Sequence, residues 1–187
     1  MSEQSLIIRK TEQDDLKHVL AMIQELIEYQ NAEPTSLTLD DLIRDAGFTG
    51  SHPLFFSFFA EMNGQPVGYT IAFYSYSTWE GKSLILEDIY VKPSARKHGV
   101  GRKLMQATTE YAIQQGCSRL DLHVLQSNEM ARKFYGGLGA KNLTETEGWL
   151  YYNFVSYTHP SETQPGLSLV QKMRNLRKGN SVKTGIK

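Results

Sequence analysis

The residues with the clearest chemical meaning lie between Leu84 and Leu104. An apolar run leads into a basic turn that contains Gly99 and Gly101, and a long amphipathic pattern follows the turn. At the start of a helix, such a turn presents free backbone N–H groups at the positive end of the helix dipole, and glycine lets an anion approach the backbone closely. The pattern predicts a site for a phosphate-bearing cofactor, with further positive charge from Arg96, Lys97, Arg102 and Lys103.

Two adjacent carboxylates, Glu87 and Asp88, precede this turn within the apolar run. Successive side chains of an ideal strand point to opposite faces, so both carboxylates can face one pocket only if the strand bulges there. Without a bulge they are a surface acidic pair flanked by the core residues Leu86 and Ile89. Both interpretations remain open from the sequence.

Hydrophobic periodicity predicts the elements that must position these residues. Strands are predicted at 6–9, 54–61, 67–76, 83–91, 119–125 (a buried strand) and 149–157, long helices at 14–30 and 101–115, and short helices after Thr38 and Ser127. Local signals are the possible N-caps Thr11 and Ser127, a capping box of Thr38 with Asp41, and an Asn63-Gly64 hairpin turn. The order β-α-α-β-β-β-α-β-α-β-β indicates the α/β (α+β) class, with a mixed central β-sheet flanked by helices.

Composition limits the function classes. Lys+Arg and Asp+Glu each number 20, and this zero net charge argues against a dedicated nucleic-acid binder. The single Cys117 excludes an intrachain disulfide and a cysteine-rich zinc site, and the five histidines lack paired spacing, so we expect no metal. Because the N-terminus lacks a signal-peptide core and the apolar stretch 54–60 is too short to span a bilayer, we expect no membrane association and a cytoplasmic location.

The 187 residues are enough for one domain with a sizeable core, which we expect to span residues 1–158. The sequence then becomes turn-rich, and residues 171–187 carry six Lys or Arg and no acidic residue. We expect residues 159–187 to form a basic tail, which is either solvated and flexible or able to bind a partner or an anion.

Two common phosphate-binding motifs do not fit the turn. The Walker A spacing Gly-x-x-x-x-Gly-Lys-[Ser/Thr] is absent, and Gly99-x-Gly101 lacks the third glycine of a dinucleotide fingerprint. The spacing Arg96-x-x-Gly99-x-Gly101 between a strand and a helix resembles instead the acyl-CoA turn of the GNAT superfamily of N-acetyltransferases.

The resemblance covers about residues 5–155. Residues 76–82, 86–91 and 143–149 resemble the diamine acetyltransferase branch, which contains spermidine/spermine N1-acetyltransferase and thialysine Nε-acetyltransferase. Ser77-Thr-Trp79 and Glu87-Asp-Ile-Tyr90 resemble the thialysine enzyme more closely. The resemblance implies a GNAT fold, acetyl-CoA (coenzyme A) as cofactor, a small-molecule amine as substrate, and a homodimer.

The resemblance also implies catalytic and cofactor-binding roles. Tyr135 is implied as the proton donor to the CoA sulfur, and Glu87 as the general base acting through a water. The family opens its fourth strand near this point, which implies backbone contacts to the cofactor from Ile89, Tyr90 and Val91. The other implied cofactor contacts are Arg96, Lys97, His98, Gly99, Val100, Gly101, Arg102 and Asn128. On the residues alone, Tyr135 could simply pack beside Phe134, and Asn128 could simply cap a helix.

Amine recognition requires carboxylates and aromatic walls. The substrate contacts implied by the resemblance are Tyr29, Gln30, Trp79, Glu87, Asp88 and Glu147 with Trp149, although both tryptophans could instead be structural. Gln30 and Ser77 stand where the spermidine/spermine enzyme carries acids, and losing two negative charges weakens binding of a tri- or tetracation most. We therefore expect thialysine, lysine-like compounds or short diamines as substrates.

Other functions stay open at this point. The same fold could acetylate polyamines, or a protein or peptide amine. A third possibility is an acyl-CoA-binding module without turnover, which the presence of Glu87, Asn128 and Tyr135 disfavours. The least favoured is nucleic-acid binding through residues 92–103 and the basic tail. A further departure is Lys97, which stands where the branch usually has glycine and so tests the geometry of the turn.

Overall fold

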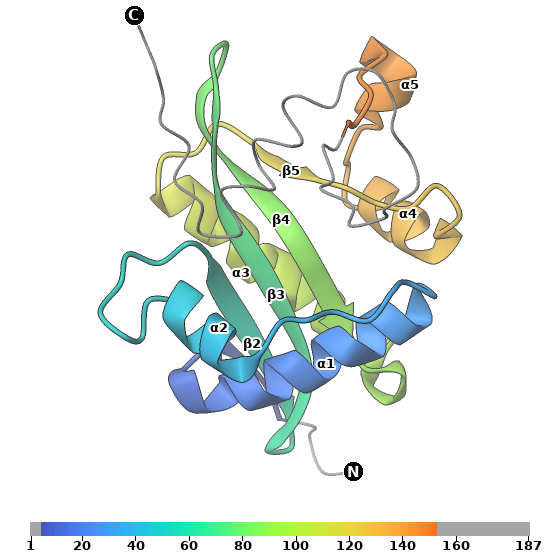
Figure 1. The fold of residues 1–187 in the computed structure, drawn as a ribbon. Coiled ribbons are helices and arrows are strands. Elements are labelled where there is room, and N and C mark those ends of the chain that lie inside the picture. The colour runs from blue at the N-terminus through green and yellow to red at the C-terminus, as the bar shows by residue number, and fades with distance from the viewer. Residues whose placement is uncertain (1–4, 153–187) are drawn as a thin grey trace, which may run out of the picture. The chain divides into compact units, whose positions relative to one another are not determined.

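The computed structural model describes residues 5–152, and the chain divides into two compact units, residues 1–128 and 129–187. The first unit is built on a five-stranded sheet with the strand order β1-β2-β3-β4-β5 (Figure 1). Its elements are β1 (Leu6–Lys10), α1 (Leu16–Tyr29), α2 (Leu39–Asp45), β2 (Phe56–Met62), β3 (Gln65–Ser77), β4 (Gly81–Val91), α3 (Val100–Gln114) and β5 (Leu120–Leu122), with single 3-10 turns at Gln13–Asp15 and Pro93–Ala95.

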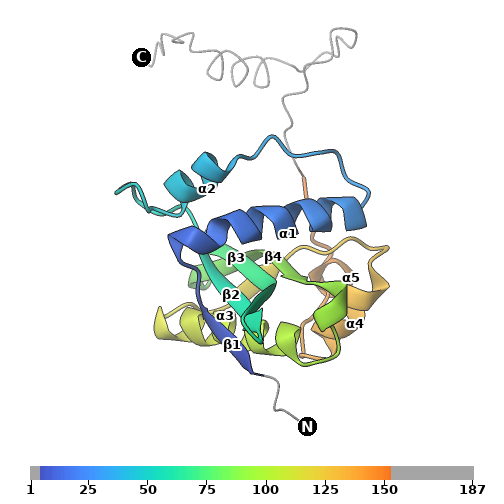
Figure 2. The ribbon, with the colours of Figure 1, turned by 90° about the horizontal axis from the view of Figure 1, so that it is seen from below.

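The first unit has three layers, because helices cover both faces of the sheet (Figure 2). Leu16 and Val19 of α1 and Leu42 of α2 pack against one face of the sheet, in a cluster that includes Phe59 and Tyr69. On the opposite face, α3 contributes to a second cluster whose buried members are Phe58, Ala60, Val67, Ala95, Val100 and Leu104. The predicted mixed sheet with helices on both faces is therefore confirmed.

Sheet pairing follows the predicted hairpins. β1 to β4 pair antiparallel, while β5 pairs parallel to β4 over Leu84–Leu86. Asn63 and Gly64 have φ values of 52° and 73°, the left-handed geometry of a tight hairpin turn between β2 and β3. The Asn63-Gly64 prediction is confirmed.

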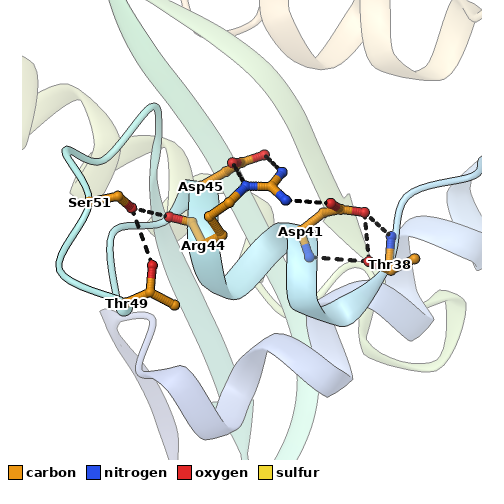
Figure 3. A network of polar contacts seen from close by, with 6 residues as sticks. All are labelled: Thr38, Asp41, Arg44, Asp45, Thr49 and Ser51. Carbon is orange, nitrogen blue, oxygen red and sulfur yellow. Dashed lines mark hydrogen bonds and ion pairs between the residues drawn. The ribbon is translucent and has the colours of Figure 1, made fainter. Parts of the chain in front are cut away.

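The two predicted helix starts behave differently. The Thr38 hydroxyl accepts the Asp41 N–H at 3.1 Å and the Asp41 carboxylate accepts the Thr38 N–H at 3.1 Å, so the predicted capping box is present (Figure 3). Thr11, in contrast, is not the N-cap of the first helix: its hydroxyl bonds to Ser57, and the box is formed by Glu12 with Asp15. The spacing alone did not decide between them, because Asp14 follows Thr11 by three residues just as Asp15 follows Glu12.

The second unit carries α4 (Glu129–Gly136) and α5 (Leu143–Glu147). Because α4 begins at Glu129, Asn128 and not Ser127 stands directly before the helix, so the predicted cap is one residue too early. The sequence did not predict α5, which begins where the Asn142 side chain accepts the Thr144 N–H at 3.2 Å.

Two strand predictions were wrong in extent. The strand predicted at 119–125 covers only Leu120–Leu122 and is half-buried, while Val124 and Leu125 are exposed. Residues 149–152 form no strand, and residues 153–157 of that prediction lie outside the described residues, as does the predicted tail at 159–187. The apolar residues of the first segment do form a strand, β5, but β5 is short and pairs with only one neighbouring strand, β4, in the described sheet.

Candidate active site

The turn between β4 and α3 has the geometry of an anion cradle. Gly99 is the N-cap of α3 with φ of 80°, and no side chain makes a capping hydrogen bond there. The first intrahelical bond of α3 runs from the Lys103 N–H to the Gly99 carbonyl at 3.0 Å. The preceding N–H groups of Val100, Gly101 and Arg102 therefore have no carbonyl acceptor within the helix. The predicted residues therefore present a helix N-terminus with its dipole exposed.

The cradle imposes a left-handed conformation on Lys97 as well. Lys97 has φ of 66°, a region that non-glycine residues rarely adopt. Lys97, His98 and Gly99 are all exposed, so their backbone and side chains are accessible to a ligand. The turn thus keeps the geometry that glycine favours, and Lys97 brings an additional positive charge into it.

Arg96 is held between the cradle and the end of α1. Its Nε donates to the Val91 carbonyl at 3.0 Å, and its guanidinium carbon lies 5.4 Å from the centroid of the Tyr29 ring. Tyr29 is 47% exposed, and Gln30, which follows it, is also exposed. The structure therefore brings together a predicted cofactor contact and a predicted substrate contact, through a cation–π interaction.

A bulge in β4 decides where the carboxylates lie. Ile71 pairs with Asp88 and Ala72 pairs with Leu86, so Glu87 is an extra residue with no partner in β3. This is the two-against-one count of a β-bulge, and it reverses the alternation of faces along the strand. The bulge that the sequence required for Glu87 and Asp88 to serve one pocket is present.

The same region of β4 has an open edge. β5 pairs with β4 only as far as Leu86, so from Glu87 onward β4 has no strand on that side among residues 5–152. The Lys92 N–H bonds to Val67 in β3, and alternation then directs the amides of Ile89 and Val91 toward the open edge but that of Tyr90 toward β3. Of the three predicted backbone contacts, Ile89 and Val91 have the required direction and Tyr90 does not.

Asp88 is the most perturbed carboxylate of this region. It is half-buried, and burial raises its pKa to about 6, although a hydrogen bond from Tyr69 opposes the rise and the nearby Glu87 adds to it. The Tyr69 hydroxyl donates to Asp88 Oδ2 at 3.2 Å. A carboxylate with a pKa near neutrality is suited to bind or release a proton during catalysis.

The side chain of Tyr90 points toward α1. Its hydroxyl donates to Glu25 at 2.8 Å, and the Lys92 ammonium lies 3.4 Å from the same carboxylate. Burial, with the Glu25 bond, raises the pKa of the Tyr90 hydroxyl to about 12. Tyr90 therefore fixes α1 against β4 beside the site.

Trp79 is separated from the other predicted residues of the first unit. Its side chain lies in the β3–β4 turn and the residue is 80% exposed, while its backbone N–H donates to the Ser77 hydroxyl at 3.2 Å. Figure 1 shows this turn at the opposite end of the hairpin from α1. Seven residues of strand between Gly81 and Asp88 correspond to ~23 Å, so the structure does not bring Trp79 to Asp88 within this unit.

The second unit carries the remaining predicted residues. Tyr135 is half-buried on α4, with its ring 5.5 Å from that of Phe134. Glu147 ends α5, and its carboxylate accepts the indole N–H of Trp149 at 3.0 Å. Glu147 and Trp149 therefore form a pair. Asn128, the last residue of the first unit, directly precedes α4, where its N–H bonds to the Leu125 carbonyl.

Sequence reasoning missed two residues of the site, Tyr69 and Glu25. Tyr69 is fully buried in the middle of β3 and reads as one more apolar residue of a hydrophobic strand. Glu25 reads as a polar position of an amphipathic helix. No local motif marks either residue, since each acquires its partner only when β4 packs against β3 and α1.

Residues 5–152 contain neither a candidate metal site nor a candidate membrane-spanning helix. No group of three or more His, Cys, Asp or Glu is placed to hold a metal ion, and no helix in that range is long and apolar enough to cross a membrane.

Comparisons with known proteins agree on the class of this site. The model of the Acetyltransferase (GNAT) family matches residues 20–140. Thialysine N-epsilon-acetyltransferase from Bos taurus is 38% identical over 157 residues, covering 80% of this chain and 92% of that protein. The enzyme of the same name from Sus scrofa is 39% identical over 158 residues, with the same coverage.

Two further comparisons are more distant. The spermidine/spermine N(1)-acetyltransferase-like protein 1 from Homo sapiens is 34% identical over 155 residues, which is 79% of this chain and 22% of that protein. Among solved structures, the aminoglycoside N-acetyltransferase AAC(6')-Iy in complex with CoA superposes with a TM-score of 0.65 at 22% identity, over 81% of this chain and 96% of that one. This last likeness concerns the fold.

The chain belongs to the GNAT acetyltransferase family. It is an N-acetyltransferase that uses acetyl-CoA. The uncapped start of α3, the left-handed Gly99 and the surrounding cations fit the diphosphate of that cofactor, and the amides of Ile89 and Val91 fit its extended arm.

The left-handed Lys97 generates a testable prediction. Lys97→Gly and Lys97→Ala both remove the charge, so both should weaken CoA affinity equally in calorimetry. In thermal or denaturant unfolding, the glycine variant should be the more stable of the two by about 1 kcal/mol, because only glycine relieves the strained φ. Glycine is normally the less stabilising residue of this pair, so an alanine variant of equal or greater stability would contradict the assigned conformation.

Asp88 generates a prediction about pH. Its pKa is raised in the folded protein, so its stabilising contribution is complete at low pH and is lost as pH rises through about 6. At pH 8, Asp88→Asn should therefore be more stable than the wild type, with a free energy of unfolding larger by up to about 3 kcal/mol. This difference in stability should vanish below about pH 4.

Asp41 provides a control of opposite sign. The hydrogen bond from Thr38, first among several, lowers the pKa of Asp41, so its contribution is present at neutral pH and is lost as pH falls. Asp41→Asn should be less stable than the wild type at pH 8, and that difference should shrink in acid. If Asp88→Asn followed the same direction as Asp41→Asn, the burial assigned to Asp88 would be wrong.

Proposed function

We propose that the protein transfers the acetyl group of acetyl-CoA to the primary amine of a small molecule, with thialysine, lysine-like compounds or short diamines as the substrate class. The observation that carries this proposal is the bulge at Glu87, which displays two consecutive carboxylates directly upstream of the phosphate cradle. The names of the relatives that match most of this chain support the same class of amine.

The charge of the predicted substrate contacts favours a short amine over a polyamine. Gln30 is uncharged and exposed at the end of α1. Ser77 is also uncharged, and its hydroxyl accepts the N–H groups of Trp79 and Glu80 at 3.2 Å, so it stabilises the hairpin turn. Each missing acid removes one attraction for a second or third ammonium group, which costs a long polyamine more than a substrate with one distal charge.

Proton transfer is the main chemical demand on this chain. An aliphatic ammonium has a pKa near 10.4, so only about one molecule in 2,500 is a free amine at pH 7. In the proposed reaction, Glu87 takes a proton from the ammonium through a water, and the amine nitrogen forms its bond to the acetyl carbon. The carbon–sulfur bond breaks and Tyr135 protonates the sulfur, while the second proton leaves the nitrogen and restores the Tyr135 hydroxyl through solvent. The products are an amide, CoA with a free thiol, and one proton held by Glu87.

Other parts of the proposal follow the family resemblance. Asn128 binds the cofactor arm, and Glu147 with Trp149 contributes to amine recognition. We also propose a homodimer and a cytoplasmic location. The alternative functions within this fold are polyamine N1-acetylation and acetylation of a protein or peptide amine.

Steady-state assays of CoA release test the substrate class. Thialysine, lysine, putrescine, spermidine and a lysine-containing peptide should be compared at pH 7.5 and at pH 9. Thialysine should have the highest kcat/KM at pH 7.5, because its side-chain sulfur lowers the amine pKa and enlarges the free-amine population. A higher kcat/KM for spermidine or for the peptide would replace the proposed class with the corresponding alternative.

The acid role of Tyr135 has its own test. Tyr135→Phe should lower kcat by about 100-fold or more, because general acid catalysis contributes on that scale, while CoA affinity in calorimetry stays within about two-fold. The matched control is Tyr152→Phe, which removes an exposed tyrosine hydroxyl from the same unit and should leave kcat unchanged. Unchanged turnover in Tyr135→Phe would remove Tyr135 from the chemical step.

A further inference from the structure

The Tyr69–Asp88 hydrogen bond is a feature that the proposed proton transfer does not use. Tyr69 lies in the middle of β3 and has no exposed surface. Its hydroxyl donates to Asp88 Oδ2 at 3.2 Å across the β3–β4 pairing. A buried hydroxyl of this kind has few other partners available, so the bond fixes the carboxylate to a rigid strand.

The bulge at Glu87 is what makes this bond possible. Before the bulge, Leu84 pairs with Tyr74, whose hydroxyl reaches Tyr111 on α3 at 3.3 Å, so Leu84 lies on the α3 face. In a regular strand Leu86 and Asp88 would follow it onto that face. The extra residue reverses the alternation, so Asp88 lies on the α1 face, where Tyr69 also lies.

The surroundings of Asp88 leave one of its oxygens for a ligand. Among residues 5–152, the side-chain hydrogen bond to Asp88 is accepted by Oδ2, and none is made to Oδ1. The titratable groups facing it are Tyr69 from β3 and Glu87 from β4. Tyr90, whose ring lies 6.3 Å from that of Tyr69, is bonded to Glu25 of α1. Further out, Lys92 lies 3.4 Å from Glu25 and Arg96 lies beside Tyr90, but neither is among the groups that shift the pKa of Asp88. Within residues 5–152 an ionised Asp88 therefore has no directly paired cation, and a substrate ammonium would supply one.

We propose that Tyr69 is a positioning residue of the amine site, whose hydroxyl holds Asp88 ionised and oriented so that Oδ1 binds the ammonium group of the substrate. The inference rests on the proposed function, because it needs an amine substrate at the β4 bulge. Glu87 keeps the role of proton acceptor, while Asp88 supplies the fixed negative charge.

This arrangement has a consequence for the dependence of activity on pH. Burial and Glu87 favour protonated Asp88, whereas the Tyr69 bond favours the carboxylate. Removing the hydroxyl leaves only the contributions that favour protonation, so the pKa of Asp88 rises further. A purely structural tyrosine would change stability but would leave this pKa in place.

The test is Tyr69→Phe, which retains the ring and its packing. Carboxyl carbon NMR of protein labelled at aspartate, without cofactor or amine, should show the Asp88 resonance titrating near pH 6 in the wild type and about one pH unit higher in the variant. The resonance is assigned by its absence in Asp88→Asn. In steady-state assays, kcat/KM should fall about five-fold at pH 6 and by less than about 1.2-fold at pH 8, following the ionised fraction.

Two variants serve as controls. Tyr74→Phe removes a hydroxyl from the same strand, but that hydroxyl bonds to Tyr111 and Gln115 on the opposite face, so neither the Asp88 titration nor the pH profile should move. In an Asp88→Asn background, adding Tyr69→Phe should leave the pH profile unchanged, because the group that Tyr69 controls is no longer ionisable.

The outcomes separate this inference from the proposed function. An unchanged Asp88 titration in Tyr69→Phe overturns the positioning role, whatever the enzyme acetylates. A shifted titration with an unshifted kcat/KM profile overturns the placement of Asp88 at the amine. If the Asp88 titration shifts in Tyr69→Phe but the wild-type protein acetylates no amine of the panel, the proposed function is overturned and, with it, the ammonium role of Asp88. Shifts in both measurements support the inference.

Discussion

The bulge at Glu87 is the constraint on which the rest of the site depends. One extra residue in β4 reverses the alternation of faces, so that Leu84 and Leu86 belong to the α3 side while Asp88 and Tyr90 belong to the α1 side. A regular strand would direct Asp88 into the apolar contacts of α3, where an unpaired carboxylate would be costly. The irregularity therefore gives one strand both a core-forming half and a half that carries the two adjacent carboxylates Glu87 and Asp88.

The phosphate cradle is made by backbone rather than by side chains. The left-handed conformations at Lys97 and Gly99 turn the chain sharply enough for α3 to begin with its first N–H groups uncapped. Arg96 then bonds to Val91 and stacks on Tyr29, so its position links β4, the turn and α1. In the proposed function, Arg96 would therefore connect the place of the cofactor with the end of α1, where the amine is expected.

Local signals were enough to predict the cradle and most elements, but not the contacts between elements. Gly99, the Thr38 capping box and the Asn63-Gly64 turn act within a few residues of themselves, and the structure contains each as predicted. Gly101 lies inside α3 and has no positive φ, so the unusual backbone conformation expected there is found only at Gly99. The Tyr69–Asp88 bond depends on strand register and on the bulge, neither of which has a local marker. The short β5 and the absence of a strand at residues 149–152 have a related reason, since an apolar run forms a strand only where a neighbouring strand pairs with it.

Asp88 shows how function and stability oppose each other in this fold. Burial makes the ionised carboxylate costly, as its raised pKa indicates, and no basic side chain in the described part of the chain is among the groups that shift this pKa. In the proposed amine site, a positively charged substrate would be the counter-ion, so part of its binding free energy would come from relieving a cost already present in the free enzyme. The same argument explains why Tyr69 matters: a neutral donor stabilises the carboxylate without occupying the place of the ammonium, whereas a lysine or arginine in its position would neutralise Asp88 and remove the attraction for the substrate.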